Sequence, residues 1–344
     1  MWAHNLKMYM ITALLLSAAA ASERAAASTR AAAASERVVT CSGTQLPVND
    51  SEISLYTTFF QHFNDTSVTA KSSLSFETLA AISTVRSKGV DLGEALVVVR
   101  QIEAQLVTKS GETQTLDNIK TIWRERWEEV AQMNYLAGTQ SATKGVAHYA
   151  EASSRLLRAC TYYQLAEKFA DNHTSPVAKS LFNKSVIAFE QGIALSRTPC
   201  KRVRMPFQNS MMHGYVCPAL CVGVGGESGG SRGSTPCVAK ATVLAHTGYD
   251  GSAEQTYHEV AHSARERGYN VLVFDGPGQG YTARFNGLTF TPKWGKVVDA
   301  ALDFLTTYMP SWSGLPVVLW GRSFGGYLAP KAFADDNVEK RILA

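Results

Sequence analysis

The stretch that decides the fold is residues 315–326, LPVVLWGRSFGG, in which an apolar run leads directly into a serine flanked by glycines. A short apolar run of this kind predicts a buried strand, and the segment 325–335 that follows predicts a helix. A serine between such a strand and helix, with glycines two residues before and after it, fits the G-x-S-x-G pattern of a nucleophile turn. Ser323 is therefore the candidate catalytic nucleophile.

The two glycines have a steric reason. The turn is so tight that side chains at these positions would collide, and the strained serine projects its Oγ above the sheet. A serine hydroxyl becomes a good nucleophile when a histidine removes its proton. The backbone N–H of Phe324, in the first turn of the helix, would point at the developing oxyanion. A Gly/Ser turn without a catalytic role is the alternative, and the strand and helix around the serine argue against it.

The segments before this turn predict a sheet. Apolar runs bounded by Gly, Pro and Asn alternate with helical stretches, which predicts an α/β fold with a parallel sheet, right-handed crossovers and helices on both faces. Such sheets carry their chemistry at the carboxyl ends of the strands. The predicted elements are a hairpin over 201–207 and 211–219, strands at 239–246, 269–275 and 315–320, and helices at 252–267, 292–308 and 325–335.

The loop after the strand 239–246, residues 247–251 (TGYDG), is expected to supply the second oxyanion donor. Gly248 would let the backbone approach the substrate, and the N–H of Tyr249 is the candidate donor. Asp250 lies at the same rim. It would contact the substrate or the attacking water, or else cap the helix that begins at 252.

A glycine-rich segment, residues 276–280 (GPGQG), follows the strand 269–275. It lacks the spacing of a Walker loop and has no Lys-Ser/Thr after it, so a tight turn at the exit of a strand is the better interpretation.

A competing motif is HEVAH, residues 258–262, which matches the zinc pattern H-E-x-x-H with Glu259 as general base. A zinc site needs a third ligand, and the extended pattern would place it at 268, where glycine stands. His258, His262 and Arg265 share a polar face of the predicted helix, so a solvated surface is the simpler interpretation. No metal and no cofactor are predicted, and a metalloprotease is kept as the third hypothesis.

The first part of the chain is divided into three. Residues 1–22 predict a secretory signal, because Lys7 precedes an apolar stretch that ends in a run of alanines. Residues 23–72 predict a low-complexity linker and an irregular segment. Residues 73–198 predict a helical, cap-like domain, and 199–344 the N-terminal part of the α/β core.

Apolar residues recur at steps of three and four within the helical domain, over 93–107, 117–137, 144–170 and 176–195. Their large side chains are expected to form the core of a helical layer, while a few would face a substrate pocket beneath the helices. The candidates are Trp123, Trp127, Tyr135, Tyr149, Leu156, Tyr163, Phe169, Phe182 and Phe189.

Cysteines and sequons suit the secretory pathway or the extracellular space. The six cysteines leave the pairing open, although Cys221 and Cys237 flank a Gly/Ser-rich loop that they would staple. Four Asn-x-Ser/Thr sequons predict a glycoprotein, and they begin at Asn49, Asn64, Asn172 and Asn183. A secreted protein is therefore expected.

The net charge of +4 is spread over 33 basic and 29 acidic residues without a basic block, which argues against a nucleic-acid partner. A small-molecule substrate is the expected partner, with no membrane contact beyond the signal peptide. The sequence does not decide whether the protein forms a homo-oligomer.

These motifs together resemble the α/β-hydrolases with an N-terminal helical domain, a group that includes 2,6-dihydroxypseudooxynicotine hydrolase and fungal pigment-pathway polyketide-shortening hydrolases. The resemblance covers about 115–344. The residues that carry it are Trp127, Tyr162-Tyr163, Phe189, Gly248-Tyr249-Asp250, and the segments 267–272 (RGYNVL), 274–280 (FDGPGQG) and 323–330 (SFGGYLAP).

The resemblance implies a Ser-Asp-His hydrolase that cleaves a carbon–carbon bond next to a ketone, or an ester, in an aromatic or polyketide-like molecule. In this fold the triad acid and histidine follow the serine. The 21 residues after Ser323 contain no histidine, and Asp335 and Asp336 lie on or just beyond a helix that leads away from the site. We expect a C-terminally truncated chain that lacks both triad partners and is inactive by itself. A ligand-binding pseudo-hydrolase is the second hypothesis.

Overall fold

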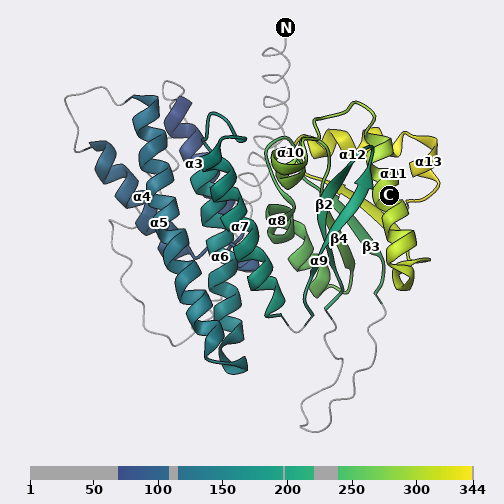
Figure 1. Ribbon diagram of the computed structural model, residues 1–344, viewed down its shortest axis with the longest axis horizontal. Helices are drawn as coiled ribbons and strands as arrows, with labels where there is room; N and C mark the ends of the chain where they lie inside the picture. The colour runs from purple at the N-terminus through teal and green to yellow at the C-terminus, as the bar shows by residue number, and fades with distance from the viewer. Residues whose placement is uncertain (1–68, 108–114, 197, 221–238, 343–344) are drawn as a thin grey trace, which may run out of the picture. The chain divides into compact units, whose positions relative to one another are not determined.

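The computed structural model describes residues 69–107, 115–196, 198–220 and 239–342, in which a group of helices precedes a five-stranded sheet (Figure 1). Helices α3 to α7 come first along the chain. They span Thr69–Ile82, Leu92–Val107, Leu116–Thr143, Tyr149–Glu167 and Pro176–Ala194, with short 3₁₀ turns η1 (Val85–Ser87) and η2 (Val146–His148) between them. The four helices predicted from apolar periodicity are confirmed as α4 to α7.

Two of these helices, α5 and α7, begin after a threonine or serine that acts as the N-cap residue. The side-chain oxygen of Thr115 accepts a hydrogen bond from the backbone N–H of Asn118, and that of Ser175 accepts one from Ala178. Pro176 occupies the first turn of α7, where a missing N–H costs nothing. α3 has no periodic apolar signal, and the sequence did not predict where it begins.

The sheet contains β1 (Lys201–Phe207), β2 (Ser210–Cys217), β3 (Thr242–His246), β4 (Asn270–Asp275) and β5 (Val317–Gly321) in the spatial order β1-β2-β4-β3-β5. β3 pairs in parallel with β4 and β5, whereas β2 pairs antiparallel with β4 and with β1. The sheet is thus mixed. The predicted hairpin is β1–β2, and the parallel part holds the three strands that bring the site together.

The connections between these strands are helical. β3 leads into α8 (Ala253–Thr256), the π-helical turn η3 (Tyr257–Ala261) and α9 (His262–Glu266), which together fill the predicted helix 252–267. β4 leads into α10 (Gly280–Asn286) and α11 (Trp294–Tyr308), then the 3₁₀ turn η4 (Pro310–Trp312). β5 leads into α12 (Gly325–Phe333) and α13 (Asp336–Glu339).

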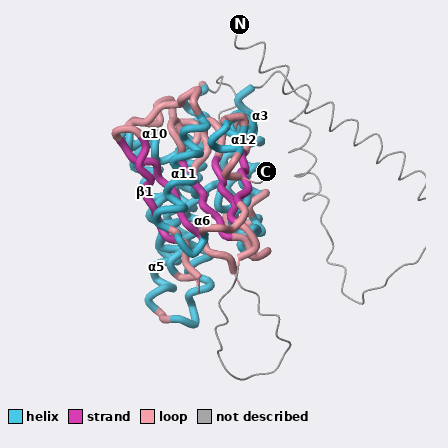
Figure 2. The backbone as a smooth tube through the Cα atoms, turned by 90° about the vertical axis from the view of Figure 1, so that its right-hand side faces the viewer, coloured by secondary structure: helices cyan, strands magenta, loops and turns pink. Residues whose placement is uncertain are grey.

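Helices cover both faces of the sheet, and Figure 2 shows the strands lying between them. Alternate residues of the strands point to opposite faces, so each face has its own apolar core. On one face, Ala245 and Val273 join Trp127 and Phe189 of the helical layer in a single cluster. On the other face, Leu244 and Leu272 pack with residues of α11 and α12. The helical layer therefore shares a core with the sheet.

Most of the large side chains predicted for the helical layer are buried there, including Trp123, Trp127 and Phe189. Tyr135 and Phe169 are partly buried and pack against the same cluster. Phe182 lines a pocket, as expected of a few members of this set.

Cys200, immediately before β1, forms a disulfide with Cys217, the last residue of β2, and the thiol of Cys160 is buried. This pairing was left open by the sequence. Cys221 and Cys237 lie outside the described residues, as do the predicted signal and linker and the sequons at Asn49 and Asn64. The side chains of Asn172 and Asn183 are exposed. Secretion and glycosylation stay predictions.

In the described part of the chain, none of the helices combines the length and apolar character needed to cross a bilayer.

Candidate active site

Ser323 lies in the turn between β5 and α12 with a φ of 54°. This is the left-handed region, which residues other than glycine rarely adopt. Lys88 and Gln208 are the other described non-glycine residues with positive φ. The Ser323 side chain is exposed, so the strained backbone presents its hydroxyl at the carboxyl end of a parallel strand.

The glycines around Ser323 are needed for packing. A Cβ on Gly321 would overlap the carbonyl oxygen of Gly325, and a Cβ on Gly325 would lie 2.5 Å from the carbonyl oxygen of Thr247. In contrast, a Cβ on Gly326 would meet nothing closer than 3.8 Å. The lack of room for side chains at Gly321 and Gly325 is therefore confirmed, whereas Gly326 has room for a Cβ.

The loop after β3, residues 247–252, packs directly on this turn. A Cβ on Gly248 would lie 2.8 Å from the backbone nitrogen of Phe324 and 2.9 Å from the carbonyl oxygen of Arg322. Within the described residues, neither the N–H of Tyr249 nor that of Phe324 donates a hydrogen bond. The N–H groups of the two predicted oxyanion donors thus have no described acceptor, and their role as donors to an oxyanion stays a prediction.

Gln279 holds this loop in place. Its side-chain amide donates to the carbonyl oxygens of Thr247 and Gly248, and the N–H of Gly280 donates to the carbonyl of Gly251. The segment 276–280 is the strand-exit turn predicted from its sequence, but the role of the Gln279 side chain was not foreseen. Only the folded sheet shows that the exits of β3 and β4 lie side by side.

Aromatic rings form a wall beside the serine. Tyr249 stacks on Phe290 with ring centroids 5.7 Å apart, Phe290 meets the edge of Phe324 at 5.8 Å, and Phe324 stacks on Tyr327 at 5.5 Å. Tyr249 and Tyr327 are 72% and 58% exposed. Large exposed aromatic surfaces next to a candidate nucleophile favour a flat, apolar ligand.

Arg322, the residue before the nucleophile, forms an ion pair with Glu259, with Nη1 and Oε1 2.7 Å apart. Burial raises the pKa of Glu259 to about 7, although Arg322 acts against this shift. The Gln255 amide donates to the same carboxylate oxygen at 3.0 Å. The turn that carries Ser323 is therefore tied to the π-helical turn η3.

Asp250 forms an ion pair with Lys168 of α6, at 2.7 Å, and Lys168 also lies 3.4 Å from Glu77 of α3. Burial raises the pKa of Asp250, but Lys168 outweighs it and the pKa stays below its usual value. The cap of α8 is Ser252, which accepts from the N–H of Gln255. The alternative that Asp250 caps this helix is wrong, because its carboxylate is engaged by the helical layer.

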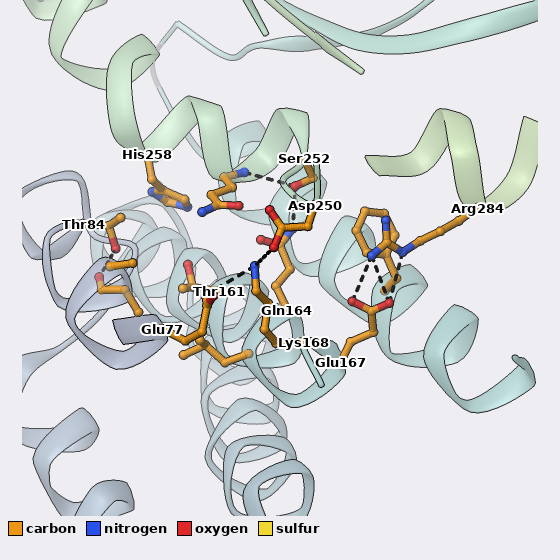
Figure 3. A pocket seen from close by; sticks show the side chains of 15 residues that line it. Glu77, Thr84, Thr161, Gln164, Glu167, Lys168, Asp250, Ser252, His258 and Arg284 are labelled. Carbon is orange, nitrogen blue, oxygen red and sulfur yellow. Dashed lines mark hydrogen bonds and ion pairs between the residues drawn. The ribbon is translucent and has the colours of Figure 1, made fainter. Parts of the chain in front are cut away.

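A pocket lies between the helical layer and the loop 247–252 (Figure 3). Its volume is about 50 Å³. Figure 3 shows Lys168 reaching to Asp250 and Arg284 lying against Glu167, so charged residues of α6 meet residues of the α/β core there. His258 also lines this pocket.

Comparison with solved structures identifies the architecture. The crystal structure of 2,6-dihydroxy-pseudo-oxynicotine hydrolase superposes with a TM-score of 0.54 and 18% sequence identity, over 74% of this chain and 62% of that chain. Residues 238–342 match the family model described as serine aminopeptidase, S33. This chain has the α/β-hydrolase fold.

Curated proteins similar to this chain are fungal hydrolases. Hydrolase acrC of Aspergillus aculeatus is 29% identical over 76% of this chain and 59% of its own length. The 20-hydroxy-prefusarin hydrolase FUS2 of Gibberella moniliformis is 27% identical over 80% of this chain and 61% of its own length. The chain thus spans about three fifths of the length of these relatives, and the resemblance inferred from its motifs is confirmed.

No described histidine forms a hydrogen bond with the serine of this turn, although His246 lies against it. The hydroxyl of Ser323 forms no hydrogen bond to a described residue. His246 pairs with Gly321 in the sheet, and a Cβ on Gly325 would lie 3.2 Å from its Nδ1. It is fully buried, with Nδ1 close to the Thr247 carbonyl, and burial lowers its pKa to about 4. Asp335 caps α13 and supplies no partner to the serine either.

The H-E-x-x-H segment is not the solvated face expected of it. His258 is 5% exposed and its Nδ1 lies 3.2 Å from the carbonyl oxygen of Ser87, because the helical layer covers this side of the helix. Arg265 is 1% exposed and bonds to the Pro218 carbonyl. His262 alone stays near the surface, where it faces Glu266 at 3.4 Å.

A buried group of His213, Glu254 and Asp275 lies at the carboxyl end of β4, with one ligand atom of each within 4.8 Å of the others. The Arg202 guanidinium donates to Nδ1 of His213, so the ring proton stays on Nε2, which faces Glu254 at 3.1 Å. A metal would need the Nε2 lone pair. The group therefore fits a hydrogen-bonded network, in which Tyr215 also donates to Glu254.

Proposed function

We propose that this α/β-hydrolase is a serine hydrolase with Ser323 as its nucleophile. The single observation that carries the proposal is the left-handed backbone of an exposed serine at the end of a parallel strand. Maintaining that conformation costs about 1 kcal/mol or more, and such strain is concentrated at functional sites. The unused N–H groups of Tyr249 and Phe324 beside it support the same conclusion.

In the proposed reaction the Ser323 oxygen attacks a carbonyl carbon, and the carbonyl oxygen becomes an oxyanion that accepts from Phe324 and Tyr249. The carbon–carbon or ester bond then breaks, the leaving group takes a proton, and water releases the acyl group from the serine. The proposal includes an acid and a histidine placed after the serine in the triad order of this fold.

The proposed substrate is an aromatic or polyketide-like small molecule, cleaved next to a ketone or at an ester. The wall formed by Tyr249, Phe290, Phe324 and Tyr327 supports this class, since it offers exposed rings next to the serine. Two similar proteins are named as hydrolases of the small molecules 20-hydroxy-prefusarin and 2,6-dihydroxy-pseudo-oxynicotine, which is in keeping with a small-molecule substrate.

A fluorophosphonate probe tests the nucleophile, because it reacts with activated serines. We expect one covalent label on a protein that includes the acid and histidine placed after the serine, mapped to Ser323 by peptide mass spectrometry and lost in Ser323→Ala. Ser313→Ala is the matched control, since Ser313 is exposed in the loop before β5 and should not affect labelling. Labelling that persists in Ser323→Ala would assign the reactivity to another residue and end the proposal.

A ligand-binding pseudo-hydrolase is the second candidate, and it is favoured because no described base forms a hydrogen bond with Ser323. It predicts no labelling of the wild-type protein, together with saturable binding of an aromatic ketone that survives in Ser323→Ala. The labelling experiment therefore separates the two candidates.

A further inference from the structure

The turn that carries Ser323, the serine turn, has a strained backbone that its surroundings must hold. The φ of Ser323 is 54°, and a conformation of this kind persists only where neighbouring contacts over-determine it. Two hydrogen bonds lie within the turn, from the N–H of Gly325 to the Arg322 carbonyl at 2.7 Å and from Gly326 to the Ser323 carbonyl at 2.9 Å. The bond that ties the turn to β3, from the N–H of Arg322 to the His246 carbonyl, is 3.3 Å long and thus at the weak end of the range. The side chain of Arg322 supplies a second link.

That link is the ion pair between Arg322 and Glu259, in which Nη1 and Oε1 are 2.7 Å apart. It is the one ion pair that Arg322 forms among the described residues. The nearby carboxylates of Asp250 and Glu77 are both bound by Lys168, at 2.7 and 3.4 Å. Because the Arg322 side chain is 30% exposed, it could turn to water without its partner. Glu259 therefore fixes where the guanidinium lies.

Glu259 is itself held in place by its neighbours. The Gln255 amide donates to the same Oε1 at 3.0 Å, and the N–H of Gln255 donates to the hydroxyl of Ser252. That hydroxyl also accepts from the side chain of Gln164 in α6, at 2.9 Å. Glu259 lies in the π-helical turn η3, whereas the other short turns η1, η2 and η4 are 3₁₀ helices. Single π-helical turns are rare and are often found at functional sites.

The position of Glu259 is costly for stability. Its side chain is 12% exposed, and its Oε2 has no hydrogen-bond partner within the described residues. Buried ion pairs are weak contributors to stability, and apolar residues often replace them without loss. A residue that gives up stability in this way is better explained by what it positions, since sites commonly trade stability for activity.

We propose that Glu259 is a positioning residue that acts through Arg322 and holds the serine turn, so that the Ser323 hydroxyl and the N–H of Phe324 keep their directions. The consequence for reactivity rests on the proposed function, whereas the anchoring of the turn does not. The glutamate of the HEVAH segment thereby has a role other than that of a general base.

Amide hydrogen exchange followed by NMR tests the anchoring on this chain. Glu259→Met keeps the length of the side chain and removes the acceptor. We expect the amides of Arg322 and Gly325 to exchange about tenfold faster in this variant, the usual effect of losing one charged hydrogen bond. Glu259→Gln keeps an uncharged acceptor and should give an intermediate effect, about threefold. The amide of Leu244 in β3 should keep its rate, which separates local loosening from global unfolding.

Glu129→Met is the matched control. It removes an ion pair with Arg126 in which the charged atoms are also 2.7 Å apart, but this pair lies on α5. The exchange of the serine turn should not change in this variant.

The consequence for reactivity is measured with a fluorophosphonate probe, on a protein that includes the acid and histidine placed after the serine. We expect Glu259→Met to lower the maximal rate of Ser323 labelling about tenfold and to leave the reversible binding of the probe unchanged. Glu259→Gln should again be intermediate, and Glu129→Met should match the wild type. A purely structural role of Glu259 would not separate rate from binding in this way.

The outcomes separate this proposal from the proposed function. Unchanged exchange of the turn amides in Glu259→Met would overturn the anchoring, and faster exchange with an unchanged labelling rate would overturn the positioning role. A wild-type protein that is not labelled would contradict the proposed function, while the exchange rates would still decide whether Glu259 anchors the turn. If Glu259→Met does not fold, Arg322→Met breaks the same pair from its more exposed side and takes its place.

Discussion

At the residue scale, the surroundings of the serine turn decide which of its glycines can carry a side chain. Gly325 has no room for a Cβ because the Thr247 carbonyl oxygen would lie 2.5 Å away, whereas a Cβ on Gly326, one residue later, would meet nothing closer than 3.8 Å. Both belong to the first turn of α12 and look alike in the sequence. Their different surroundings arise only when the loop after β3 packs on the turn.

Gly325→Ala should therefore destabilise the protein, and Gly326→Ala should not. We expect a loss of about 1–3 kcal/mol in the free energy of unfolding for the first, as for other overpacked sites. The second should be neutral or slightly stabilising, because alanine favours a helix over glycine by about 1 kcal/mol. Urea unfolding followed by circular dichroism measures both. Equal effects of the two substitutions would mean that the loop does not press on the turn.

At the scale of elements, the site is assembled from strand exits and from the helix that follows β3. The strands and helices themselves were predictable, because apolar period and glycine placement are local properties of the sequence. The interpretation of HEVAH as a solvated face was wrong, since the residues that bury His258, such as Ser87, come from a distant part of the chain. The same reason hid Gln279 as an anchor of the loop 247–252.

The link between η3 and the serine turn predicts a pH dependence. The folded pKa of Glu259 is about 7 against an ordinary value of 4.5, because burial disfavours its charge more than Arg322 and Lys168 favour it. A raised folded pKa contributes stability that is complete below 4.5 and lost as the pH rises through 7. The difference of about 2.5 pH units corresponds to roughly 3 kcal/mol as an upper bound.

Glu259→Gln should remove this contribution. The free energy of unfolding of the variant, relative to wild type, should rise between pH 4.5 and 7 and level off above it. Comparison of the two proteins cancels Asp275, whose pKa burial raises to about 7 in both. Glu103→Gln, an exposed carboxyl on α4, should leave the pH profile unchanged. A profile in Glu259→Gln parallel to wild type would show that Arg322 keeps this carboxylate ionised.

At the scale of the whole molecule, the helical layer and the sheet share one apolar core, which contains Trp127 and Phe189 together with Ala245 and Val273. The sequence predicts a helical domain over 73–198 that precedes the sheet along the chain. It does not predict that this domain and the sheet share a core. Periodicity tells which face of a helix is apolar, but not which partner covers that face. The described helices and strands are therefore expected to unfold together.

The buried ion pair between Arg284 of α10 and Glu167 of α6 tests this cooperativity, since the side chains are only 7% and 4% exposed. Removing one partner leaves an uncompensated buried charge, so Glu167→Gln should cost about 3–5 kcal/mol. Glu151→Gln, which removes an exposed pair with Arg155 on the same helix, should cost less than about 1 kcal/mol. Hydrogen exchange read by mass spectrometry should show Glu167→Gln lowering protection equally in peptides from α5 to α7 and from β3 to β4. We expect equal loss because a shared core transmits the destabilisation to both regions. Loss of protection confined to the helical peptides would instead mean that helices and sheet unfold as separate units.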